Sequence, residues 1–144
     1  MDDLLDIPLK QGITFASFDI ENMYPNIPTN ELIPIIETIS LSNQLDVNTT
    51  ELVKITHTVL EQSYFSFRNK NYSQTTGLAM GTPSSAALSE IYIQHLEHTK
   101  ITDIIIQENI IGYFRYVDDI LVVYDQASLI YIRSTKHSIT WPPQ

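Results

Sequence analysis

The sequence contains no cysteine, few basic residues and no long hydrophobic run. Without cysteine the chain forms neither disulfides nor thiolate metal sites, although this identifies no cellular compartment. Only 8 basic residues stand against 17 acidic ones, so the formal net charge is −9. Such a chain repels a phosphate backbone, which counts against a self-sufficient nucleic-acid-binding domain. A catalytic segment whose acids bind metal, while basic neighbouring segments hold the nucleic acid, remains compatible with this charge.

No apolar run is long enough to span a bilayer, and the chain starts with the acidic Met1-Asp2-Asp3 where a signal peptide would be basic. We therefore expect a soluble intracellular protein with no membrane partner. The chain has 144 residues, 43% of them hydrophobic. This length and composition predict a single domain over residues 1–144 with a real core.

The most informative stretch, residues 112–125, has two apolar, β-branched and aromatic runs around Asp118 and Asp119. This pattern predicts a tight hairpin with both acids at its tip. Neighbouring carboxylates repel each other unless a cation lies between them, so a bound divalent metal would explain the pair. Aspartate is also a common turn residue that points into water, and the pair alone favours this simpler interpretation.

A second acid, Asp19, ends the apolar run 13–20, which predicts a buried strand. Burying a charge without a partner is costly, so this position needs a reason. A carboxylate that caps the following loop is one acceptable explanation. We expect no regular structure in that loop, residues 21–28, because it holds Pro25, Asn26 and Pro28.

The middle of the chain predicts packing elements. Thr29 is a candidate N-cap for a helix through Ile39, and Asn48 with Glu51 resembles a capping box for a second helix through Val59. Three further segments are expected: a hairpin of 64–68 and 72–75 joined by 69–71, a connection 104–112 leading to the central hairpin, and a weakly helical tail from 127 to 132. Residues 133–144 are expected to be poorly ordered.

A glycine-rich loop, residues 77–85, precedes a helix through Leu96 that Thr82 or Ser84 could cap. Such a turn can present backbone N–H groups to an anion, although an ordinary loop explains the motif alone. It lacks the Gly-Lys-Ser/Thr ending of a P-loop. His95 and His98 share one helix without a third ligand nearby, so we interpret them as surface or packing residues.

In their order along the chain, these signals resemble the palm of reverse transcriptases. Residues 18–28, Phe-Asp-Ile-Glu-Asn-Met-Tyr-Pro-Asn-Ile-Pro, are most similar to the Penelope-like branch, and Phe114-Arg-Tyr-Val-Asp-Asp119 matches the family's most recognisable motif. The resemblance implies an α+β fold, a polymerase palm in which two or three helices pack on one face of a small, mostly antiparallel sheet. It implies RNA-directed DNA polymerisation by two-metal catalysis.

The resemblance also implies a role for each motif residue. Asp19 and Asp118 would bind two Mg²⁺ ions, or Mn²⁺, with help from the Ile20 carbonyl, and Asp119 would be a supporting acid. The remaining implied contacts are to nucleotide or nucleic acid: Tyr24 as the gate against a ribose 2′-hydroxyl; Met80, Gly81 and Thr82 at the incoming deoxynucleoside triphosphate and template; Tyr116 and Val117 at the primer terminus. The implied partners are an RNA template and a DNA primer, and the implied location is the nucleus.

The chain departs from the family pattern at Pro25, where a threonine is expected, and at Thr82, where a serine is common. Only 18 residues precede Asp19 and 25 follow Asp119, so the resemblance covers the palm without fingers or thumb. An inactive retroelement fragment, acting at most as a binding module, is therefore the main alternative. A nucleotide cyclase is a third possibility, which Tyr24 and the glycine-rich loop disfavour.

Overall fold

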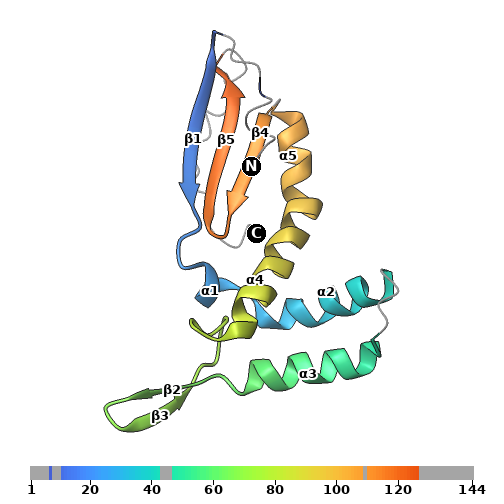
Figure 1. Ribbon diagram of the computed structural model, residues 1–144, viewed down its shortest axis with the longest axis vertical. Coiled ribbons are helices and arrows are strands. Elements are labelled where there is room, and N and C mark those ends of the chain that lie inside the picture. Colours follow the sequence, from blue (N-terminus) through green and yellow to red (C-terminus); the bar gives the residue numbers. More distant parts are fainter. Residues whose placement is uncertain (1–6, 8–10, 43–46, 109, 127–144) are drawn as a thin grey trace. The chain divides into compact units, whose positions relative to one another are not determined.

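The computed structural model describes residues 7, 11–42, 47–108 and 110–126, and it is α+β as predicted (Figure 1). The chain divides into two compact units. The first contains the described residues up to Glu21 and from Leu96 onward, and the second is Asn22–His95. That residues 1–144 form one palm domain stays a prediction, and the expected tail, 127–144, lies outside the described residues.

The first unit contains a three-stranded antiparallel sheet in the order β1-β5-β4, with β5 in the centre (Figure 1). Its strands are β1 (Ile13–Asp19), β4 (Ile110–Tyr116) and β5 (Asp119–Asp125). Among the described strands, the first in sequence thus pairs with the last. This pairing brings the first acidic motif beside the second.

A helical segment accompanies this sheet: the π-helical turn η2 (Glu97–Ile101) continues into α5 (Thr102–Gln107), and α5 contacts β4. The predicted connection 104–112 does lead into the hairpin, and it includes the end of α5 and the start of β4 at Ile110. The Thr102 hydroxyl donates to the Glu97 carbonyl at 2.9 Å, which supports the change of helical register at η2.

The prediction that residues 13–20 form a buried strand is right about the strand and wrong about its burial. Phe15 and Phe18, on opposite faces of β1, are 52% and 48% exposed. The reason is that β1 is an edge strand, while α5 contacts the other edge of the sheet. Only Val123 in the central strand is fully buried among the described sheet residues.

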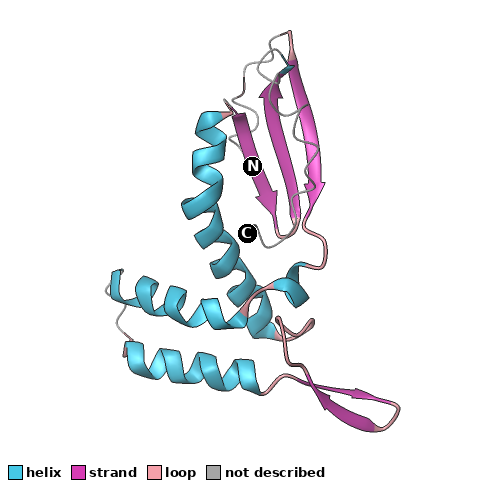
Figure 2. Ribbon diagram, turned by 180° about the vertical axis from the view of Figure 1, so that it is seen from behind, coloured by secondary structure: helices cyan, strands magenta, loops and turns pink. Residues whose placement is uncertain are grey.

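The second unit is mainly helical. Its helices are α1 (Met23–Asn26), α2 (Thr29–Ser42), α3 (Thr49–Glu61) and α4 (Pro83–Leu96), the last of which belongs to it up to His95. The helices α2 and α3 lie side by side (Figures 1 and 2). Fully buried Leu32, Ile27 and Tyr92 mark the core, and the Tyr92 hydroxyl donates to a Glu31 carboxylate oxygen at 3.1 Å.

Of the three predicted N-caps, Asn48 and Thr82 lie at the expected position, and the short helices α1 and α5 were not predicted. The Asn48 side chain accepts hydrogen bonds from the Thr50 and Glu51 N–H groups, which confirms it as the N-cap of α3. The helix α2 already includes Thr29, so the predicted N-cap is one residue too late. The expectation of no regular structure in 21–28 is wrong, because Pro25 fits within the single turn α1, where its missing N–H is not needed.

The small hairpin pairs β2 (Tyr64–Phe67) with β3 (Lys70–Ser73) (Figure 2). Its turn is Arg68-Asn69, and both residues have positive φ, 50° and 59°, as in a type I′ turn. The predicted three-residue connection 69–71 is therefore one residue too long. No helix in the part of the chain that the structure describes is long and apolar enough to cross a membrane.

Candidate functional site

The four residues predicted to hold metal meet at one end of the three-stranded sheet. Asp19, the last residue of β1, is the direct cross-strand partner of Asp119, the first residue of β5. Residues directly opposite each other in an antiparallel pair point to the same face of the sheet. The N–H of Ile20 donates to the carbonyl of Asp118 at 3.0 Å, which ties the end of β1 to the turn. Asp19 and Asp119 are exposed, and Asp118 is half-buried.

The hairpin turn itself consists of Val117 and Asp118, because Tyr116 pairs with Asp119 across it. The prediction that both acids lie at the tip is thus corrected by one residue. Val117 has φ 58°, a left-handed conformation that is rare for a β-branched side chain. Positive φ at the first turn position alone matches the type II′ class, which normally has glycine there. Strained backbone of this kind often marks a functional site.

The chemistry of this sheet end suits a hard divalent cation. Like charges directly opposite each other on paired strands destabilise a sheet, as Asp19 and Asp119 do here, and a cation between them would reverse that effect. Carboxylate and carbonyl oxygens are the ligands that magnesium prefers, and magnesium keeps several waters. Among the described residues, no three acidic or histidine side chains form a ready-made metal cluster. His95 and His98 are exposed, as expected for surface residues.

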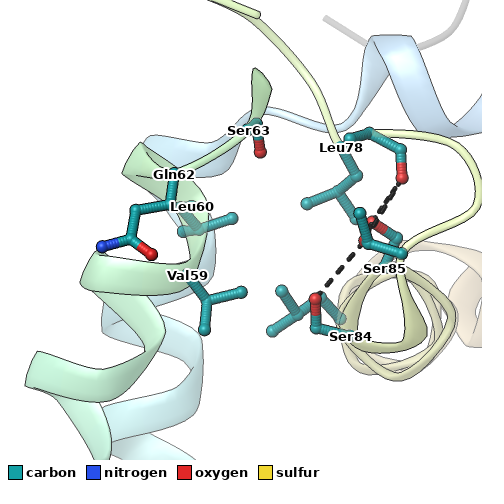
Figure 3. A pocket seen from close by; sticks show the side chains of 10 residues that line it. Val59, Leu60, Gln62, Ser63, Leu78, Ser84 and Ser85 are labelled. Atoms are coloured by element: carbon teal, nitrogen blue, oxygen red, sulfur yellow. Dashed lines mark hydrogen bonds between the residues drawn. The ribbon is translucent and has the colours of Figure 1, made fainter. Parts of the chain in front are cut away.

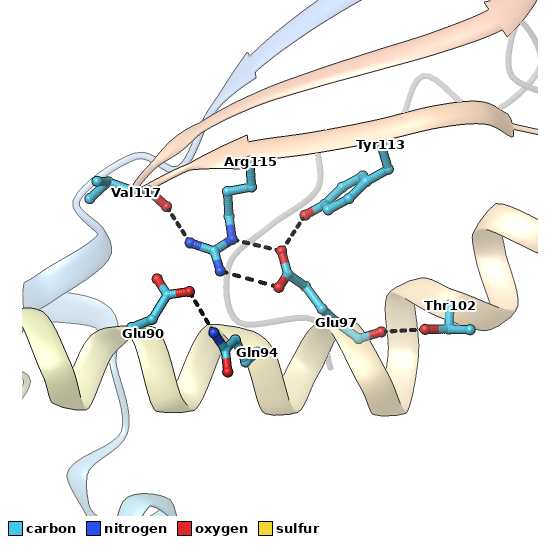
Figure 4. Close-up of polar contacts among 7 residues, drawn as sticks. All are labelled: Glu90, Gln94, Glu97, Thr102, Tyr113, Arg115 and Val117. Atoms are coloured by element: carbon cyan, nitrogen blue, oxygen red, sulfur yellow. Dashed lines mark hydrogen bonds and ion pairs between the residues drawn. The ribbon is translucent and has the colours of Figure 1, made fainter. Parts of the chain in front are cut away.

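A partly buried polar network lies next to the acidic end and was not predicted from the sequence (Figure 4). The Arg115 guanidinium donates to both carboxylate oxygens of Glu97, at 2.6 Å and 3.2 Å, and to the Val117 carbonyl at 3.0 Å. The Tyr113 hydroxyl donates to the same Glu97 carboxylate at 2.9 Å. Burial, reinforced by Glu97, raises the pKa of Tyr113 well above its usual range. The sequence contains one indication of this network, an arginine within an apolar strand.

The predicted nucleotide-contacting residues lie in the second unit, where the structure joins two of the motifs. The carbonyl of Tyr24 accepts a hydrogen bond from the N–H of Leu78 at 2.8 Å. Gly77 has φ 70°, and a Cβ at this position would lie 2.2 Å from the carbonyl oxygen of Pro25. Only glycine allows this close approach. The Tyr24 segment and the glycine-rich loop are therefore one structural feature.

The rest of the glycine-rich loop is open. Met80 is 68% exposed, and a Cβ at Gly81, whose φ is 87°, would meet no atom within 4 Å. Thr82 immediately precedes α4, which begins at Pro83, in the position predicted for the N-cap. Its hydroxyl contacts the Ser85 hydroxyl. The loop thus presents accessible backbone beside the start of a helix.

A pocket of about 220 Å³ lies behind this loop, between the end of α3 and the start of α4 (Figure 3). Val59 and Leu60 line one side, and Leu78 and Ser84 line the other. Of the residues predicted to contact substrate, only Thr82 lines this pocket. None of the four residues predicted to hold metal lines this pocket.

The two residues predicted to contact primer belong to the first unit with the acids. Tyr116 is 80% exposed and Val117 is 40% exposed, and both adjoin Asp118 along the hairpin. The structure thus brings together the metal and primer residues in one unit, and Tyr24 with the glycine-rich loop in the other.

Comparison with known proteins supports the interpretation of these motifs as those of a reverse transcriptase. Residues 4–139 match the family model described as reverse transcriptase (RNA-dependent DNA polymerase). The chain belongs to the reverse transcriptase family. No curated protein matches it. Among solved structures, this reverse transcriptase chain is similar to apo telomerase from Candida tropicalis truncated from its C-terminal domain, with a TM-score of 0.67 at 15% identity.

That structural match covers 89% of this chain and 27% of the telomerase chain. At this identity the likeness shows a shared fold, and it confirms the predicted α+β arrangement of small antiparallel sheets and helices. The chain spans about a quarter of the length of the solved relative.

Proposed function

We propose that this chain is the catalytic palm of an RNA-directed DNA polymerase, and that it belongs to the Penelope-like branch of its family. The direct opposition of Asp19 and Asp119 beside the Val117-Asp118 turn carries the proposal. Membership of the reverse transcriptase family supports it. The subtype rests on the Phe18–Pro28 motif alone.

The acidic end of the sheet would hold the metal ions of the reaction, two Mg²⁺ or their Mn²⁺ substitutes. Asp19, Asp118 and the Ile20 carbonyl would provide ligands, with Asp119 in support. Bound there, magnesium would stabilise the charge that develops when a primer 3′-hydroxyl attacks the nucleotide α-phosphate. The exposure of Asp19 and Asp119 leaves room for water and phosphate oxygens to complete the coordination.

The remaining site residues would select and orient the substrates. Tyr24, held through its carbonyl by Leu78, would contact the sugar and exclude a ribose 2′-hydroxyl. Met80 and Gly81 would contact the deoxynucleoside triphosphate and the RNA template, and Thr82 would support the loop. Tyr116 and Val117 would contact the terminus of the DNA primer.

Primer extension by the full-length natural protein on an RNA template tests the proposal. Asp118→Asn keeps the size of the side chain and removes its charge, so we expect the extension rate to fall at least about a hundredfold. Asp103→Asn, an exposed acid on α5, is the matched control and should extend normally. Unchanged extension by Asp118→Asn would show that the assignment is wrong.

An inactive fragment is the second candidate, favoured by the net charge of −9. The two candidates differ in their response to ligands. Titration of the 144-residue chain with Mn²⁺ and with a labelled RNA–DNA template-primer should show metal binding without duplex binding, because the acids are present and the net charge of −9 repels a phosphate backbone. If the chain binds no Mn²⁺, the result would favour the inactive fragment.

A further inference from the structure

We propose that Glu97 and Arg115 are positioning residues that hold the Val117-Asp118 turn in the geometry required for metal binding. This inference rests on the proposed polymerase function. Neither residue is expected to touch substrate or metal. Their effect would pass through the backbone of the turn.

The first support is the burial of the pair. The Arg115 side chain is only 7% exposed, and the Glu97 side chain is 21% exposed. A buried charge is tolerated when it is paired with an opposite charge and hydrogen-bonded. The bidentate contact between Arg115 and Glu97 provides the opposite charge and two hydrogen bonds. Tyr113 adds a third donor to the carboxylate. The guanidinium is therefore fixed in position and orientation.

The second support is a further hydrogen bond donated by the same guanidinium. Its Nη1 donates to the carbonyl of Val117, the residue with φ 58° (Figure 4). That carbonyl belongs to the peptide group joining Val117 to Asp118. On the other side, the carbonyl of Asp118 accepts from the N–H of Ile20. Both peptide groups flanking the Asp118 Cα are thus held by hydrogen bonds, one from Arg115 and one from β1.

The third support is the placement of the pair on the sheet. Arg115 is the cross-strand partner of Ile120, whereas Tyr116 is the partner of Asp119. Since successive residues of a strand point to opposite faces, Arg115 lies on the face opposite Asp19 and Asp119. The acids stay accessible on one face while the turn is held from the other. An arginine on the acidic face would instead compete with a metal for the carboxylates.

Without this hydrogen bond the strained turn could adopt a different backbone conformation. Val117 in a left-handed conformation persists only while its surroundings maintain it. If the guanidinium is lost or misplaced, the Val117-Asp118 peptide can rotate toward a more favourable conformation. The Asp118 carboxylate would then move with its backbone.

The test uses Glu97→Gln, Arg115→Met and the double variant in the full-length natural protein. We expect each single variant to lower kcat for primer extension at least about tenfold and to leave the KM for deoxynucleoside triphosphate within about twofold, because these residues touch no nucleotide. Mn²⁺ affinity, measured by electron paramagnetic resonance without substrate, should weaken several-fold. The double variant should be little worse than either single one, since both remove one unit.

Three controls separate positioning from general folding. Lys100→Met and Asp103→Asn remove exposed charges from the same helical segment and should change neither kcat nor Mn²⁺ affinity. Tyr113→Phe removes one hydrogen bond without leaving a charge unpaired, and it should give a smaller loss than Glu97→Gln. Circular dichroism establishes the folded fraction of each variant, to which all rates are normalised.

Normal kcat and Mn²⁺ affinity in Glu97→Gln and Arg115→Met would overturn the inference. So would losses that disappear after correction for the folded fraction, since they would show a purely structural ion pair. Asp118→Asn decides the proposed function separately. If that variant loses extension while the Glu97 and Arg115 variants do not, polymerase function stands and positioning fails.

Discussion

Asp19 and Asp119 lie directly opposite each other across the antiparallel strands β1 and β5, although 100 positions of sequence separate them. Two exposed carboxylates in this arrangement repel each other in the absence of a cation. The same arrangement makes them suitable joint ligands for one. Local stability and the proposed metal binding would therefore oppose each other at this end of the sheet.

The first prediction concerns this opposition. Asp19→Asn should raise the thermal midpoint of the metal-free protein slightly, because it removes the cross-strand repulsion, and should reduce the additional stabilisation that Mg²⁺ provides. Thermal denaturation with and without millimolar Mg²⁺ measures both effects. Asp103→Asn, remote from the strand pair in sequence, should behave like the natural protein. A lower metal-free midpoint for Asp19→Asn would contradict the prediction.

The second prediction compares two glycines with positive φ. Gly77→Ala should destabilise the protein by about 2–3 kcal/mol, because its Cβ would collide with the Pro25 backbone as well as occupy an unfavourable conformation. Gly81→Ala should cost only about 1 kcal/mol, since open space surrounds that position. Urea unfolding of the two variants gives the difference directly. Equal losses would mean that the contact with Pro25 does not matter.

The third prediction concerns alkaline pH. Burial, then the hydrogen bond and charge of Glu31, raises the pKa of Tyr92 to about 12 from its usual 10.0. A pKa raised by folding stabilises the protein below the unfolded value, and this contribution is lost as pH rises through the folded value. The natural protein should therefore lose stability between about pH 10 and 12 more steeply than Tyr92→Phe. Urea unfolding across that range checks it, and parallel curves would refute it.

The fourth prediction concerns the choice of sugar. Tyr24→Ala in the full-length protein should raise the efficiency of ribonucleotide incorporation relative to deoxynucleotide incorporation by about tenfold or more, because the proposed gate against the 2′-hydroxyl would be gone. Its backbone carbonyl still accepts from Leu78, so the loop should keep its position. Tyr64→Ala, an exposed tyrosine on β2, is the matched control. Unchanged selectivity in Tyr24→Ala would remove this role.

Local chemistry predicted much of the fold and much of the candidate site. The Asn48 cap, the end of β1 at Asp19 and the hairpin around Asp118 follow from residue types within a few positions of each other. The predictions were wrong where residue types alone do not determine the backbone conformation. Proline usually interrupts helices, yet Pro25 fits within a single helical turn. The turn at Arg68-Asn69 requires positive φ at an arginine, which the sequence gives no reason to expect.

By itself the sequence determined the set of candidate site residues: Asp19, Asp118 and Asp119 as acids, with Tyr24 and the glycine-rich loop beside them. Only the tertiary structure decided that Asp19 faces Asp119, because strand order and register depend on packing between distant segments. It also decided what Arg115 contacts. The role of a charged residue on a strand depends on the group buried against it, and Glu97 comes from a helical segment whose contact no local pattern reveals.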